Sequence, residues 1–171
     1  FDLVLERAAS VTGQHLPVYD FGVAPTSHIS GLAEPALFHL HGQSYGLRLL
    51  NTDEETATHK ESIRPLLADS LRNHVVLVSG YSGQSAAAFE VMQEEYTAQN
   101  YVFWLGHSSS PAPHLKPLLE RQYATYIGGC DFDRSMLTLA KELGVWPPTF
   151  HTTPPEHLQA LLAEVAAYPV A

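Results

Sequence analysis

Two periodicities alternate along the chain. Short apolar runs rich in β-branched and aromatic residues predict four strands, at 36–40, 74–79, 101–105 and 123–127. Longer segments with apolar residues at helical spacing predict helices at 2–10, 61–72, 85–98, 114–121 and 133–144. Strands that alternate with helices are typical of a parallel sheet covered by helices. We therefore expect an α/β protein, a Rossmann-like three-layer fold with a mainly parallel sheet.

Prolines mark two further features of this pattern. Pro65 and Pro117 each lie within a predicted helix, and we expect both in a first turn, where a missing N–H costs little. The segment 146–155 (WPPTFHTTPP) predicts a rigid link. After it, one apolar stripe at helical spacing predicts a C-terminal amphipathic helix: Leu158, Leu161, Leu162 and Val165. The predicted organisation is a domain at 1–145, followed by a linker and helix at 146–171.

Composition narrows the functional classes. A chain of 171 residues with 45% hydrophobic residues can bury one sizeable core. The net charge of −9 argues against a nucleic-acid or anionic-membrane surface, and no apolar run reaches a membrane-spanning length. The single Cys130 excludes an internal disulfide and a four-cysteine zinc module, and it fits a reducing, cytoplasmic compartment. Because the first residue is Phe1 and not Met, we expect a fragment of a larger protein.

Small or polar residues follow all four predicted strands. These endings are His41–Ser44, Gly80–Gly83, Gly106–Ser110 and Gly128–Asp131. In open α/β sheets, ligands bind outside the carboxyl ends of the strands, where glycines allow close backbone approach and helix N-termini offer N–H groups to anions. The pattern therefore predicts a nucleotide-type site. Each ending also has a structural interpretation: Ser82, Ser85 and Asp131 as helix N-caps, and Cys130 as a small buried residue.

Two histidines lie one step apart at the end of the first predicted strand. Side chains alternate along a strand, so His39 and His41 project from the same face. They could form an acid–base site, a metal site or two satisfied surface histidines. A metal-dependent hydrolase would need a third ligand, for which Asp131 or Asp133 is available, although helix capping explains these carboxylates more simply.

Four motifs taken in order resemble the second half of the sirtuin-like NAD-binding fold. They are LFHLHG, VVLVSGYSG, YVFWLGHSSSP and YIGGCDFDRSMLTLAKELG, and with FDLVLERA at the start the resemblance covers residues 1–145. The chain is most similar to the prokaryotic NAD-hydrolase branch, which splits NAD into nicotinamide and ADP-ribose, often in antiphage defence. The resemblance implies NAD or ADP-ribose as ligand.

The resemblance also implies roles for single residues. His41 falls on the family's active-site histidine, and Asp2 falls on the aspartate of its Asn-x-Asp motif. The residues implied in cofactor binding are Gly42, Gly80, Tyr81, Ser82, Cys130 and Asp131. His39 matches no functional position of the family, so we expect it to be structural.

Three departures from the family refine this expectation. The Gly-rich turn that grips pyrophosphate is absent, because the chain starts after it. Many relatives carry an aspartate where this chain reads Gln84–Ser85. No cysteine lies between His41 and Val75, so the zinc ribbon of the protein-deacetylating sirtuins is missing. We therefore expect no zinc, and the NAD-consuming branch is favoured over a deacylase.

The expected chemistry is cleavage of the nicotinamide–ribose bond through an oxocarbenium-like state. A histidine such as His41 can accept a proton near neutral pH, and a carboxylate such as Asp2 could orient the attacking water. The alternatives are a non-catalytic module that senses NAD or ADP-ribose, and the metal-dependent hydrolase. We also expect a homo-oligomer, fused to or associated with another domain.

Overall fold

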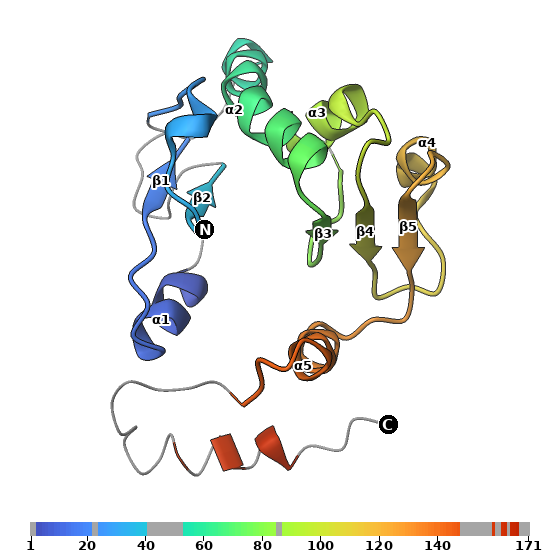
Figure 1. Cartoon of the computed structure of the whole chain (residues 1–171). Helices are drawn as coiled ribbons and strands as arrows, with labels where there is room; N and C mark the ends of the chain where they lie inside the picture. The colour runs from blue at the N-terminus through green and yellow to red at the C-terminus, as the bar shows by residue number, and fades with distance from the viewer. Residues whose placement is uncertain are drawn as a thin grey trace. The chain divides into compact units, whose positions relative to one another are not determined.

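The computed structural model describes residues 3–21, 24–40, 53–84, 87–147, 159, 162–163 and 165–167, with the backbone alone for 53–56 (Figure 1). The chain divides into two compact units. The main unit comprises Pro17–Cys130, and the terminal unit comprises Leu3–Leu16 and Asp131–Ala171.

Two small parallel sheets lie in the main unit. In the first, β1 (Val18–Asp20) pairs with β2 (Leu37–His39). The second has the order β3-β4-β5, formed by Val76–Val78, Val102–Leu105 and Ala124–Ile127 (Figure 1). All four predicted strands are present, and the α/β class with parallel pairing is confirmed. The four strands do not form one sheet among the described residues, because β2 pairs with β1, a strand that the pattern did not predict.

Each predicted helix in the main unit has a counterpart. They are α2 (Asp53–Asn73), α3 (Ala87–Glu95), and η2 (Pro113–Leu115) running into α4 (Lys116–Leu119), besides the short η1 (Ile29–Gly31). Pro117 lies in the first turn of α4, as predicted. The prediction for Pro65 was wrong, because α2 begins at Asp53 and Pro65 lies in its interior.

Two apolar clusters form the core, and α2 and α3 contribute to both. The first contains Leu71, Phe89, Met92, Tyr96, Val102, Trp104, Leu115 and Leu118. The second contains Phe21, Ile63, Leu66, Ala87, Ala88 and Val91. Side chains alternate along β4, so Val102 and Trp104 point into the first cluster and are almost fully buried. One face of the β3-β4-β5 sheet thus packs against α3 and α4. The turns that follow the strands form its carboxyl edge.

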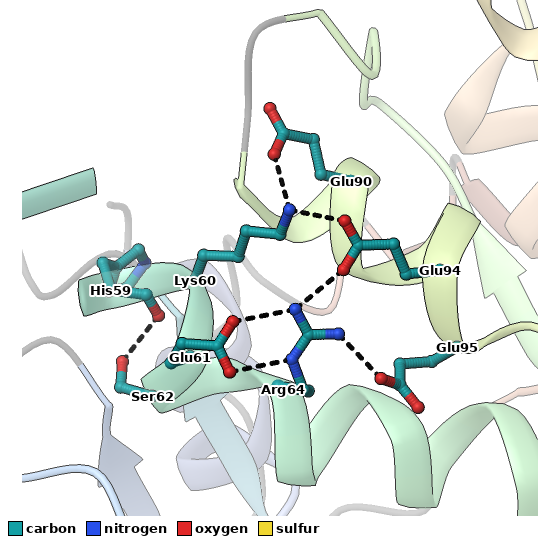
Figure 2. Close-up of polar contacts among 8 residues, drawn as sticks. All are labelled: His59, Lys60, Glu61, Ser62, Arg64, Glu90, Glu94 and Glu95. Carbon is teal, nitrogen blue, oxygen red and sulfur yellow. Dashed lines mark hydrogen bonds and ion pairs between the residues drawn. The ribbon is translucent and has the colours of Figure 1, made fainter. Parts of the chain in front are cut away.

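Ion pairs hold α2 to α3 (Figure 2). Lys60 and Arg64 on α2 contact four glutamates: Glu61, Glu90, Glu94 and Glu95. The Lys60 Nζ lies 2.9 Å and 2.6 Å from oxygens of its two partners on α3. The guanidinium of Arg64 lies 2.7 Å from each of its two partners on α3 and 2.8 Å from its partner on α2. We call these six residues the α2–α3 charge cluster.

The terminal unit contains α1 (Val4–Val11) and α5 (Phe132–Glu142). Asp131 caps α5, as its position predicted, because its Oδ1 accepts a hydrogen bond of 3.0 Å from the Arg134 backbone N–H. In the predicted C-terminal helix, residues 159, 162–163 and 165–166 are helical, while Leu158 and Leu161 lie outside the described residues.

Candidate functional site

The predicted catalytic residues are not among the described ones. His41, Gly42 and Asp2 lie outside the described residues, so their roles stay predictions. His39 is described, and it ends β2 opposite Asp20. Its carbonyl oxygen accepts a hydrogen bond of 3.0 Å from the backbone N–H of Phe21, which ties the end of β2 to the residue after β1.

The Gly80–Gly83 turn follows β3 and offers several hydrogen-bond donors. Gly80 and Gly83 both have left-handed backbone, with φ of +66° and +70°, which glycine adopts at low cost. Within the described part of the chain, the backbone N–H groups of Tyr81, Ser82 and Gly83 donate no hydrogen bond. The exposed Ser82 hydroxyl oxygen accepts the Gln84 N–H at 3.3 Å, which leaves the hydroxyl proton for another acceptor. A turn of this composition suits an anionic ligand.

Tyr81 uses its ring for packing. The ring stacks on Trp104 with centroids 5.8 Å apart, and it contacts both apolar clusters. Its hydroxyl oxygen is buried and makes no hydrogen bond of ordinary geometry within the described residues. Burial raises the pKa of this hydroxyl, and the backbone N–H of Phe89 partly offsets the rise. Because the ring of Tyr81 is packed and its hydroxyl is buried, the group of this residue that remains for a ligand is its backbone N–H.

The turns after β4 and β5 are joined to each other by hydrogen bonds. The backbone N–H of Cys130 donates to the carbonyl of Gly106 at 3.0 Å, and that of Gly129 donates to the carbonyl of Ser108 at 3.1 Å. The Tyr126 hydroxyl also donates to the Ser108 carbonyl, at 2.8 Å. Because β3, β4 and β5 are parallel neighbours, these turns and the Gly80–Gly83 turn follow strands at the same edge of the sheet.

Two glycines in these turns leave no room for a side chain. A Cβ at Gly106 would overlap the Tyr126 hydroxyl. A Cβ at Gly128 would lie 2.6 Å from the carbonyl oxygen of Ser109 and 2.7 Å from that of Ser108. Gly106 therefore makes room for the Tyr126 side chain, and Gly128 allows the close approach of the two turns.

Cys130 and Asp131, which the resemblance places beside the adenine, have local partners. The Cys130 thiol donates to the carbonyl of Ile127 at 3.3 Å. Asp131 caps α5 in the terminal unit. The cap confirms the structural interpretation of Asp131. Cys130 is only partly buried, so its interpretation as a buried residue was wrong. The ligand roles of both residues stay predictions.

His114 was missed by sequence reasoning, which placed it in a helix and gave it no role. Its Nε2 lies 2.9 Å from the carbonyl oxygen of Ser82, in the turn after β3. The partners are 32 positions apart in the chain, so no local sequence signal could have revealed the contact.

No three His, Cys, Asp or Glu side chains among the described residues are grouped so that they could hold a metal ion. The alternative metal site with His39 and His41 stays a prediction, because His41 lies outside the described residues. No helix among the described residues is long and apolar enough to cross a membrane.

The geometry defines a class, an α/β protein with small parallel sheets and a glycine-rich carboxyl edge. Comparisons with known protein families, with curated proteins and with solved structures find no match to this chain.

Proposed function

We propose that the chain is a Rossmann-like, sirtuin-like NAD-binding domain that hydrolyses NAD to nicotinamide and ADP-ribose. One observation carries the proposal. The Gly80–Gly83 turn, at the carboxyl end of a parallel strand, has three backbone N–H groups without a partner in the described part of the chain. Two of them belong to residues that reach solvent, the half-buried Tyr81 and the exposed Ser82, and the third belongs to the buried Gly83. The order of the four sequence motifs supports NAD as the nucleotide.

Backbone donors suit a dinucleotide on an acidic protein. The chain has a formal net charge of −9, so a phosphate would meet an unfavourable long-range field. The N–H groups of a glycine turn bind a pyrophosphate through local dipoles and need no excess of cations. The close approach at Gly106 and Gly128 keeps the neighbouring turns free of bulky side chains.

In the proposed reaction, the bond between C1′ of the ribose and the nicotinamide nitrogen breaks, and nicotinamide leaves with the bonding electrons. Water attacks the oxocarbenium-like C1′ and becomes its hydroxyl group. His41 accepts the proton that the water loses, and Asp2 orients this water and stabilises the positive charge at C1′. The proton then passes from His41 to solvent, which balances the hydrolysis.

Calorimetric titration with NAD, ADP-ribose and ATP tests the binding step. We expect NAD and ADP-ribose to bind, and ATP, which lacks the second ribose, to bind more weakly. Ser82→Ala removes one hydroxyl donor and should weaken ADP-ribose binding by roughly 2- to 10-fold. Ser27→Ala is the matched control, because Ser27 is also exposed and lies on a different segment of the main unit. Equal and negligible affinity for all three nucleotides would contradict the proposal.

A second candidate is a non-catalytic module that senses NAD or ADP-ribose. The sequence at Gln84–Ser85, where related hydrolases carry an aspartate, favours it. Nicotinamide release separates the two candidates, because a sensor would bind NAD and return it intact.

A further inference from the structure

We propose that His114 is a positioning residue that orients the Gly80–Gly83 turn for its ligand. The inference rests on the proposed function, because it assigns His114 to the same turn. It goes beyond that function by naming the side chain, supplied by the connection between β4 and β5, that fixes which backbone atoms face the ligand.

The contact between His114 and the turn is direct. The Nε2 of His114 lies 2.9 Å from the carbonyl oxygen of Ser82. A carbonyl oxygen accepts hydrogen bonds and donates none, so Nε2 must carry the proton. The contact thus selects one tautomer of the neutral imidazole and leaves Nδ1 as an acceptor.

The imidazole is itself held in place. Its ring meets the ring of Phe89 edge to face, with centroids 5.8 Å apart and planes at 86°. Leu115, the next residue of η2, is buried beside the turn, and a Cβ on Gly83 would lie 2.8 Å from its Cδ2. The η2 segment therefore contacts the Gly80–Gly83 turn through both His114 and Leu115.

Anchoring the Ser82 carbonyl also determines the direction of the Gly83 N–H. In a trans peptide the C=O and the N–H of one unit point in opposite directions. The Ser82–Gly83 peptide therefore directs its N–H away from His114 when its carbonyl is bonded to His114. Glycine allows such a peptide to rotate, since both signs of φ are accessible to it. A rotated peptide would present a carbonyl oxygen to a phosphate and repel it, and the His114 contact opposes this rotation.

Two substitutions at His114 separate positioning from packing. His114→Leu keeps an apolar side chain against Phe89 and removes the donor. His114→Gln keeps an N–H donor of similar reach. Calorimetry with ADP-ribose should give a dissociation constant roughly 3- to 10-fold higher for His114→Leu than for the unsubstituted chain, with partial rescue in His114→Gln. Thermal melts of both variants report on folding.

Spectroscopy tests the contact both in the unsubstituted chain and in the two variants. The ¹⁵N shifts of the His114 imidazole should show the proton on Nε2, and the Gly83 amide should exchange with solvent faster in His114→Leu than in His114→Gln. A proton on Nδ1 alone, with none on Nε2, would overturn the inference even if no variant folds.

The outcomes also separate this inference from the proposed function. If the unsubstituted chain binds ADP-ribose and folded His114→Leu binds it equally well, the positioning role is wrong and the proposed function stands. If the unsubstituted chain binds no ADP-ribose, the proposed function fails, and the ligand-positioning role fails with it.

Discussion

Gly80 and Gly83 share a left-handed backbone but not their surroundings. A Cβ at Gly80 would meet no atom within 4 Å, whereas one at Gly83 would lie 2.8 Å from Leu115, 3.2 Å from Trp104 and 3.3 Å from Phe89. Comparing alanine at the two positions therefore separates backbone strain from overpacking.

We expect Gly80→Ala to lower the free energy of unfolding by about 1–2 kcal/mol, the usual cost of a left-handed residue with a Cβ. Gly83→Ala should cost about 1–3 kcal/mol more, because its methyl group must displace core side chains. Urea denaturation measures both. Equal losses would show that the core around Gly83 adapts without cost.

His39 and His41 form the matched pair for the proposed chemistry. His41→Ala should lower the rate of nicotinamide release by about 10²–10⁴-fold, the usual contribution of general acid–base catalysis, and leave the thermal melt unchanged. His39→Ala should retain most of the activity and lower stability, since His39 ends a strand of the main unit. A near-normal rate in His41→Ala would refute the hydrolase and leave the sensor.

Single residues were predictable where their role is local. The capping role of Asp131 follows from its place before a helix, and its hydrogen bond to the Arg134 N–H spans three positions. The contact between His114 and Ser82 spans 32 positions and depends on how the β4–β5 connection packs, which local pattern does not encode.

Local sequence pattern was also insufficient for parts of the helices and strands. Apolar periodicity predicted 61–72 of α2, but its first eight positions read DEETATHK and carry no apolar stripe. Acidic residues are favourable at a helix N-terminus, and this signal was available in the sequence. β1 has three residues, too few for alternation to be recognised, and without it the separate β1–β2 sheet could not be predicted.

Arg64 connects α2 to α3 more extensively than any single ion pair would. Arg64→Ala removes contacts to three glutamates at once, and we expect the Tm to fall by about 2–6 °C, since exposed ion pairs are individually weak. Arg72→Ala is the control, because Arg72 lies on the same helix and makes no ion pair within the described part of the chain. In 1 M salt the difference between the variants should shrink, and a difference independent of salt would indicate lost packing instead.

The charge cluster should also make stability depend on pH. Hydrogen bonds from Lys60 and then Arg64 lower the pKa of Glu94, and the hydrogen bond from Arg64 lowers the pKa of Glu61. Carboxylates with lowered pKa values stabilise the fold above their ordinary value of 4.5, and this contribution is lost as the pH falls through the lower, folded value. Hydrogen bonds first to Glu94 and then to Glu90 raise the pKa of Lys60 above 10.5. This ion pairing also stabilises the fold, but its contribution is present below pH 10.5 and is lost as the pH rises through the higher, folded value.

The measurement is the urea midpoint of the unsubstituted chain and of Arg64→Ala between pH 7 and pH 3. The two midpoints should differ at pH 7, and the difference should shrink as the pH falls below 4.5 and the carboxylates begin to be protonated. A constant difference across this range would show that the charges of the cluster do not stabilise the fold.

At the scale of the whole molecule, the buried side chains are unevenly distributed. Every buried residue of the described chain lies between Phe21 and Leu118, within the main unit, and neither α1 nor α5 contains one. The main unit therefore holds both apolar clusters without help from the terminal unit.

We expect the fragment 17–130 to fold on its own and to unfold cooperatively. It keeps Trp104, which is 2% exposed, and omits the chain's other tryptophan, Trp146. Its fluorescence should be that of a buried indole and should shift to the red in a single urea transition. Fluorescence of an exposed indole in buffer would show that the terminal unit is needed for folding.

Gly106 and Gly128 would look alike in a mutational scan, because each position would tolerate only glycine, and a selection for activity would mark both as active-site residues. Their intolerance has different origins. The obstacle at Gly106 is the Tyr126 side chain, held by its hydrogen bond to Ser108, so a smaller residue at 126 should act as a second-site suppressor. The obstacle at Gly128 is backbone, which no substitution removes. A smaller residue at position 126 should therefore rescue a substitution at Gly106 and should not rescue one at Gly128.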